Sequence, residues 1–426
     1  PSRGLGDVYK RQTIMCSKSG RMQGVFTLLF AYQRIDRKPM TDLPPLIKDT
    51  ETLRTLCDAL SAEEFIAIDT EFLRENTYYS QLCLIQVAAG DSIAAIDPLA
   101  PGIDLTPLFE VLKNEAIMKV FHAGRQDLEI FFTLMNCLPA PIYDTQIAAM
   151  VCGYGEQVGY DRLVKGVLDI ILDKGPRFTD WAQRPLSDRQ LRYALDDVIH
   201  LASIYPIIRD EIETANRTDW VVEEINNLAN PAIYQIDPMD AWMKVKQRGN
   251  KPMNLNRLRY LAAWREEEAR RRNMPKSRLI KDETLLALAD VNPSNKAGFD
   301  RIRGFPGGAS SKLVEPALKI LKKANDVPRD DWPKVSREYR TPPPQAAADL
   351  LRVLLKHCAE DAGVAPRLIA SSDELDQIAL GERDGVNALT GWRGQLFGKD
   401  AIDLAEGRIA LSTRGRKVHL HRLEKD

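Results

Sequence analysis

Two acidic side chains, Asp69 and Glu71, interrupt the apolar stretch FIAIDTEF (65–72), whose composition is typical of a buried strand. Residues two apart in a strand leave the same face of a sheet, so we expect the two carboxylates to lie side by side. Two negative charges at this distance repel each other. Burying both carboxylates is costly unless a cation or hydrogen-bond donors compensate the charge. The pair alone is compatible with a divalent metal site or with a strand end where both acids reach solvent.

Three more groups of suitable chemistry follow downstream. KVFHAGRQDLEIFF (119–132) predicts a strand, a turn at Gly124 and a helix with Asp127 in its first turn. RYALDDVIHLASIY (192–205) predicts a helix on which Tyr193 and Asp197, four residues apart, share one face. Taken singly, each residue has an ordinary structural explanation. Asp127 could interact with the helix dipole, Tyr193 could be a half-buried core aromatic, and Asp197 could be a solvated surface charge.

Together these residues offer four carboxylates and one phenol from one strand and two helices. Carboxylate oxygens and water are the preferred ligands of Mg²⁺ and Mn²⁺. Two such divalent ions support in-line attack of water on a phosphodiester, and a phenol beside them can position that water. We therefore predict a catalytic site in which the metal ligands are Asp69, Glu71, Asp127 and Asp197 and the water-positioning group is Tyr193. Asp196 is a neighbouring acid, but the four-residue spacing from Tyr193 favours Asp197 as the ligand.

The hydrophobic pattern divides the chain into parts that must position these groups. Strand-like and helix-like segments alternate from about residue 44 to 210, which predicts a mixed α/β domain. Strands then disappear, and leucines recur at helical spacing. The expected parts are a non-native or disordered extension (1–39, with Met40 as the expected start), a catalytic domain (40–211), a basic helical domain (212–330), a proline-rich linker (331–344) and a second helical domain (345–426).

Composition narrows the class of protein. The chain has 426 residues, of which 44% are hydrophobic and 28% charged, as expected for a globular protein of several domains. Its net charge of −1 conceals a basic segment, 244–281, which suits a polyanionic partner. The six cysteines lack the spacing of a zinc site or a disulfide framework, so we expect a reducing, cytoplasmic location. The apolar run 24–32 is too short to span a bilayer, and we expect no membrane partner.

The motifs resemble those of the ribonuclease D family, in the tyrosine variant of the DEDD exonuclease superfamily. The resemblance rests on FIAIDTEFLRENTYYSQLCLIQVA (65–88), KVFHAGRQDLEIF (119–131) and the Tyr193 to Asp197 motif, with the connecting segment 158–187. It implies an α/β RNase-H-like catalytic domain, with a mixed sheet flanked by helices, followed by two all-α helical bundles. It also implies hydrolysis of single-stranded RNA from the 3′ end, with two divalent metal ions, release of nucleoside 5′-monophosphates and tRNA precursors as substrates. We expect a monomer.

Several residues are candidates for nucleic-acid contacts. In the catalytic domain, Trp181 and Arg184 suit stacking and phosphate binding, although Trp181 is equally compatible with a core position and Arg184 with an ion pair or a helix cap. Segment 255–306 resembles the HRDC domain, an auxiliary nucleic-acid-binding bundle. Its candidate contacts are Tyr260, Trp264, Arg265, Arg271 and Lys276. The run Glu266–Glu268, which precedes Arg270–Arg272, is also compatible with a solvated helix whose charges pair four residues apart.

Other interpretations remain open from the sequence. Segment 349–382 resembles a diverged second HRDC copy, although it is not notably basic. For His122 we expect a structural hydrogen bond rather than a catalytic role. The same metal site is also compatible with a 3′–5′ DNA exonuclease, since RNA is distinguished by contacts to the 2′-hydroxyl. A non-catalytic RNA-binding protein is another alternative. Such a protein would be expected to lack at least one of the four acids, and all four are present.

Overall fold

The computed structural model describes residues 43–44, 46–173, 175, 179–235, 237–246, 251–333 and 342–423. The expected N-terminal extension and most of the expected linker lie outside these residues. Among the helices that the structure describes, none has the length and apolar character needed to cross a bilayer.

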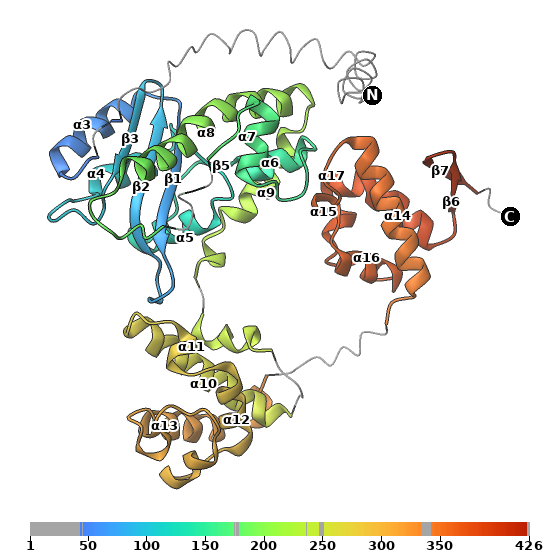
Figure 1. The fold of residues 1–426 in the computed structure, drawn as a ribbon. Helices are drawn as coiled ribbons and strands as arrows, with labels where there is room; N and C mark the ends of the chain where they lie inside the picture. The colour runs from blue at the N-terminus through green and yellow to red at the C-terminus, as the bar shows by residue number, and fades with distance from the viewer. Residues whose placement is uncertain are drawn as a thin grey trace, which may run out of the picture. The chain divides into compact units, whose positions relative to one another are not determined.

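The first part of the described chain is built on a five-stranded mixed sheet (Figure 1). Its strands are β1 (Phe65–Leu73), β2 (Gln81–Ala89), β3 (Ser92–Ile96), β4 (Met118–Phe121) and β5 (Ile142–Asp144). Their order in the sheet is β3-β2-β1-β4-β5. Short connections make β1, β2 and β3 antiparallel, whereas the longer connections that follow β3 and β4 contain helices and leave β4 and β5 parallel to β1.

Helices cover this sheet. They are α3 (Thr50–Leu60), α4 (Thr106–Lys113), α5 (Arg125–Met135), α6 (Thr145–Val151), α7 (Tyr160–Leu168), α8 (Asp188–Thr214) and α9 (Thr218–Leu228). Helix α8 has 27 residues and packs along β1, β2, β3 and β4 (Figure 1). Ile66, Ile68 and nearly all of β2 are buried, because strands covered by helices on their faces require apolar residues on both sides. The predicted mixed α/β fold is confirmed.

The second part is a helical bundle with its own core. Its elements are η2 (Pro231–Ile233), η3 (Pro238–Lys244), α10 (Pro252–Arg271), α11 (Lys276–Leu279), α12 (Asp282–Val291), η4 (Lys296–Arg301), η5 (Gly308–Ser310), α13 (Val314–Asn325) and η6 (Arg329–Asp331). Three leucines that the sequence places at helical spacing, Leu258, Leu261 and Leu285, are buried together with Phe299. Helix α10 contacts α12 and α13, so its apolar side forms the centre of the bundle.

The third part is helical up to residue 405 and ends in a hairpin. Its elements are α14 (Gln345–Ala362), α15 (Pro366–Ile369), α16 (Ser372–Ala379), η7 (Asn387–Leu389), α17 (Gly391–Arg393), η8 (Gly394–Gly398), α18 (Lys399–Ala405), β6 (Ile409–Arg414) and β7 (Lys417–Arg422). The expectation of an entirely helical segment 345–426 missed this hairpin. Arg414 pairs with Lys417 across a two-residue turn whose Gly415 has a φ of 64°, a conformation that glycine adopts without strain.

Candidate active site

Strand β1 presents Asp69 and Glu71 from the same face, as their spacing predicts. In the antiparallel pairing with β2, Asp69 lies opposite Gln86 and Glu71 lies opposite Leu84. The register then shifts between Glu71 and Phe72, which marks a β-bulge. Bulges bend a strand and change the direction in which its side chains point. The end of β1 that carries both acids is therefore locally distinct from the regular ladder that precedes it.

Helix α8 supplies the third carboxylate. The helix begins with a capping box in which the Ser187 hydroxyl accepts a hydrogen bond from the Gln190 backbone N–H and the Gln190 side chain reaches back to Ser187. Asp197 follows in the third turn and meets the acids of β1. Carboxylate oxygens of Asp69, Glu71 and Asp197 all lie within 4.8 Å of one another, and we call these three residues the carboxylate cluster. Asp196 is not a member of it.

Asp127 lies in the first turn of α5, as predicted, but outside the carboxylate cluster. Its side chain is buried and accepts a hydrogen bond from the Thr70 hydroxyl. Burial raises the pKa of Asp127 well above its usual range, and the neighbouring Asp69 charge raises it further. The structure thus brings three of the four predicted acids together and places the fourth close to Asp69, held by a threonine that the sequence analysis did not consider.

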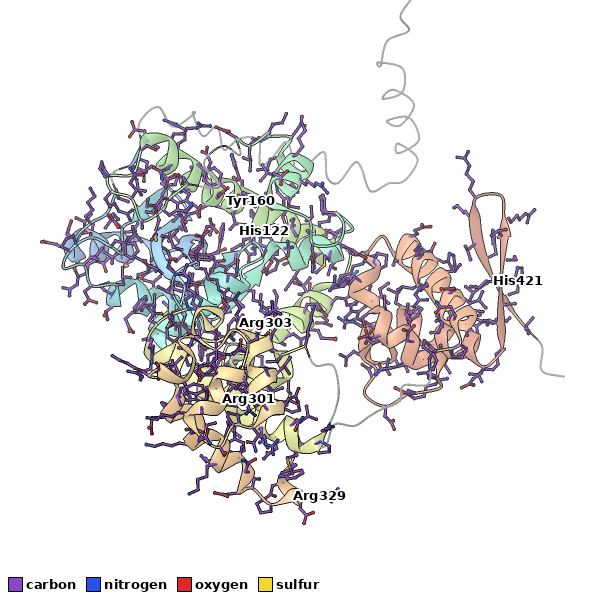
Figure 2. The ribbon with its side chains drawn as sticks, turned by 60° about the horizontal axis from the view of Figure 1, so that its bottom comes forward. His122, Tyr160, Arg301, Arg303, Arg329 and His421 are labelled. Carbon is purple, nitrogen blue, oxygen red and sulfur yellow. The ribbon has the colours of Figure 1, made fainter. Side chains whose placement is uncertain are left out.

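A pocket of about 370 Å³ opens onto the carboxylate cluster. Tyr193, His122 and Tyr160 also line it. His122 and Tyr160 lie beside each other in Figure 2, with ring centroids 5.2 Å apart. The site is therefore a cavity with an acidic side from β1 and α8 and an aromatic side from α7 and α8.

His122 and Tyr160 have clear structural roles in the wall of this pocket. The Nδ1 atom of His122 lies 3.0 Å from the Thr145 hydroxyl and its Nε2 atom 3.2 Å from the Val158 carbonyl. Burial lowers the pKa of His122, which favours a neutral imidazole. The Tyr160 hydroxyl donates to the backbone carbonyl of Asp197. The expected structural hydrogen bond of His122 is confirmed, whereas the role of Tyr160 was missed because nothing local in the sequence points to Asp197.

The carboxylates destabilise one another's charged forms. Burial raises the pKa of Asp69 to about 8, and the charge of Asp197 is the second cause. Burial also raises the pKa of the Tyr160 phenol, with further contributions from Asp197 and Asp69, so this group stays protonated. Several carboxylate oxygens within 4.8 Å, in a site that disfavours their charge, fit a divalent cation, which would neutralise them and accept oxygen ligands.

Trp181 and Arg184 hold the segment that leads into α8. Trp181 is 3% exposed, and its ring centroid lies 6.2 Å from that of Tyr193. The guanidinium of Arg184 makes two 2.7 Å hydrogen bonds to the buried Asp97 carboxylate and donates to the carbonyls of Cys83 and Trp181. These positions favour the core and ion-pair alternatives. Nucleic-acid contact by either residue remains a prediction that its surroundings do not support.

Most of the candidate contacts in the helical bundle are also engaged within the protein. Trp264 is 8% exposed, and Arg265 is buried, with its guanidinium 2.7 Å from Asp282. Arg271 pairs with Glu268 at 2.7 Å, and Lys276 with the buried Glu266 at 3.0 Å. Tyr260 differs from these residues because it lines a surface pocket.

Comparison with known proteins agrees with this fold. Residues 44–213 match the family model of a 3′-5′ exonuclease, and residues 254–320 match that of the HRDC domain. The catalytic part therefore belongs to the class of 3′–5′ exonucleases.

The relatives narrow that class. Ribonuclease D of Zymomonas mobilis is 47% identical over 90% of this chain and 99% of its own length. Ribonuclease D of Acidiphilium cryptum is 44% identical over 88% of this chain and 97% of its own length. The crystal structure of Escherichia coli RNase D, described as an exoribonuclease involved in structured RNA processing, matches with a TM-score of 0.73 and 30% identity, covering 85% of this chain and 98% of that one. The chain belongs to the ribonuclease D family of 3′–5′ exoribonucleases.

Proposed function

We propose that this exoribonuclease shortens single-stranded RNA from its 3′ end with two divalent metal ions and releases nucleoside 5′-monophosphates. The observation that carries the proposal is the carboxylate cluster, whose oxygens lie within 4.8 Å of one another in a pocket of about 370 Å³. Mutual repulsion among these acids is relieved by a divalent cation, and Mg²⁺ and Mn²⁺ prefer such oxygen ligands.

In this proposal the metal-holding residues are Asp69, Glu71, Asp127 and Asp197. Asp127 is included because its buried carboxylate interacts with that of Asp69 and because Thr70 holds one of its oxygens in place. When bound, the divalent ions supply Lewis-acid activation of water and stabilisation of the leaving 3′ oxygen.

Tyr193 is assigned to position the attacking water. It lines the same pocket as the carboxylate cluster, and Trp181 packs near its ring, which restricts the orientation of the phenol. A tyrosine hydroxyl can hydrogen-bond the water and share its proton during attack.

For the physiological substrate we propose the 3′ trailers of tRNA precursors. The support is the family, together with the description of the Escherichia coli relative as acting in structured RNA processing. We further propose a monomer in a cytoplasmic setting. The five cysteines within the described residues are free thiols, and a reducing compartment maintains thiols in that state.

The test follows 5′-labelled single-stranded RNA and matched DNA on a sequencing gel with Mg²⁺, Mn²⁺ or EDTA. We expect a metal-dependent ladder that shortens from the 3′ end of RNA, that is weak on DNA and that disappears in Asp69→Asn. Asp58→Asn, which removes an exposed acid of α3, is the matched control and should retain activity. A tRNA precursor with a 3′ trailer, compared with its mature form, tests the substrate. Equal ladders on RNA and DNA, or an active Asp69→Asn variant, would contradict the proposal.

A further inference from the structure

A second pocket lies in the helical bundle. It has a volume of about 590 Å³ and is formed mainly by α10 and α13. Its basic and aromatic lining residues are Arg259, Tyr260, Lys319, Lys322 and Lys323, and we call it the α10–α13 pocket. Helix η6, whose Arg329 is labelled in Figure 2, borders it through Asp331. No role in the exonuclease site described above accounts for this concentration of cations.

Among the described residues, the four cations of the α10–α13 pocket are not held in ion pairs with carboxylates. Lys322 and Lys323 follow Lys319 by three and four residues, so both are its neighbours on the surface of α13, and all three lysines are exposed. Within the part of the chain that the structure describes, no carboxylate lies within ion-pair distance of these lysines or of Arg259. Asp326 and Asp331 also line the pocket, which leaves an excess of two positive charges.

Other cations of the same domain behave differently. Arg271 and Lys276 were candidates for nucleic-acid contacts, yet both are paired with glutamates of α10. Pairing neutralises these side chains, whereas Lys322 and Lys323 are adjacent positive charges that an anion would stabilise. In this comparison of described residues, the positive charge without a carboxylate partner therefore lies at the α10–α13 pocket.

Tyr260 adds an aromatic surface to this charge. Its side chain is half-buried, and the Lys323 ammonium lies 5.6 Å from the ring centroid. An aromatic ring in a pocket lined by lysines provides what single-stranded nucleic acid requires, since bases stack on aromatic faces while cations follow the backbone phosphates. An inorganic anion or an acidic peptide would use the lysines but would gain little from the ring.

We propose that the α10–α13 pocket binds single-stranded RNA, with Lys319, Lys322 and Lys323 neutralising backbone phosphates and Tyr260 stacking on a base. The inference rests on the proposed RNA substrate and adds a second contact site upstream of the 3′ end. Its function is to retain the body of the RNA while successive 3′ nucleotides are removed. This site differs from the surface that carries Trp264, Arg265, Arg271 and Lys276.

The first experiment measures RNA affinity in the absence of turnover. Fluorescence anisotropy of a labelled oligouridylate of about 20 nucleotides is followed in EDTA at several salt concentrations. The triple variant Lys319→Gln/Lys322→Gln/Lys323→Gln keeps good helix formers at exposed positions, so folding should be preserved. The matched control is Lys48→Gln/Lys356→Gln/Lys399→Gln, which removes three exposed lysines elsewhere.

We expect the triple variant to bind at least about tenfold more weakly and to lower the slope of log Kd against log salt by about 2, because each lost phosphate contact contributes about 0.7. The control should change neither quantity appreciably. Tyr260→Leu should weaken binding by about tenfold, whereas Tyr260→Phe should bind as the wild type does, because it retains the stacking face.

A second experiment separates this inference from the proposed reaction. With Mg²⁺, the triple variant should raise KM for the long oligouridylate at unchanged kcat and should leave trimming of an RNA of about four nucleotides unaffected. Wild-type Kd and salt slope in both the triple variant and Tyr260→Leu would overturn the inference. So would competition by polyglutamate as effective as that by RNA. If the wild type lacked nuclease activity but the variants still lost RNA affinity, the reaction would be refuted and the binding site retained.

Discussion

Replacing Asp69 with asparagine should abolish RNA hydrolysis and at the same time stabilise the metal-free protein. Asp69 lies in a site where burial and the charge of Asp197 raise its pKa from 3.8 to about 8. A carboxyl group whose pKa is higher in the folded state binds more protons there than in the unfolded chain. Its contribution to stability therefore declines as the pH rises from about 4 to about 8, and the ionised group is destabilising above that range.

The size of this effect follows from the same quantities. The full difference in pKa corresponds to about 6 kcal/mol at pH 8. Asp69 is partly exposed to the pocket, and water screening reduces the value, so we expect a gain of about 1–3 kcal/mol for Asp69→Asn. For a domain of this size, such a gain raises the midpoint of thermal unfolding by roughly 3–10 °C.

Differential scanning calorimetry at pH 8 in EDTA measures this shift, and the unfolding transition of the catalytic domain is identified as the one that moves with Mg²⁺. Added Mg²⁺ should stabilise the wild type more than Asp69→Asn, because the variant has lost a ligand. The stability gain of the variant should shrink at pH 5.5, where Asp69 of the folded wild type is already protonated. Asp196→Asn is the control, since Asp196 is outside the carboxylate cluster and, although burial raises its pKa, the charges of His200 and Arg192 lower it.

The reasoning would be refuted if Asp69→Asn were less stable than the wild type in EDTA, or if Mg²⁺ stabilised both proteins equally. The first result would mean that Asp69 has compensating partners in the metal-free protein. The second would mean that the carboxylate cluster does not bind the ion.

Three further substitutions test how the site is held together. Tyr193→Phe should lower kcat by about 10²–10⁴-fold with RNA affinity within about twofold of wild type, measured by single-turnover kinetics and anisotropy; unchanged turnover would remove Tyr193 as the water-positioning group. Thr70→Val removes the hydroxyl that donates to Asp127, so the pKa of Asp127 should rise and the acidic limb of the pH–rate profile should move to higher pH; an unmoved limb would exclude this role. Arg184→Gln should lower the free energy of unfolding by about 2–4 kcal/mol, because it leaves the Asp97 carboxylate buried without its cation. Adding Asp97→Asn should recover part of that loss, and a purely additive double variant would contradict the coupling.

Local sequence patterns were sufficient to predict the elements that carry the acids. The spacing of Asp69 and Glu71 placed both on one face of a strand, and the four-residue spacing of Tyr193 and Asp197 placed both on one face of a helix. Asp127 is in the first turn of a helix that follows a glycine, as its surroundings predict. Each of these inferences depends on the periodicity of a single element, which the sequence contains directly.

Contacts between distant segments were not predictable in the same way. Arg184 finds its carboxylate partner 87 residues earlier in the chain, and Thr70 meets Asp127 across 57 residues. Whether an arginine binds RNA or a buried acid depends on which segments the fold brings together, and no local pattern specifies that. The hairpin of β6 and β7 is a different case, because its alternating residues 409–422 contain the signal for two strands around a glycine turn.

The geometry of the site depends on two structural features that meet at the carboxylate cluster. The β-bulge after Glu71 sets the end of β1, and the capping box at Ser187 sets where α8 begins, so Asp197 falls in a defined turn. Two contacts then fix α8 against the rest of the domain. Arg184 ties the segment before the helix to Asp97, and the Tyr160 hydroxyl binds the Asp197 carbonyl. Because the carboxylates repel one another, the surrounding structure must hold them together, and these two contacts limit the movement of α8 away from β1.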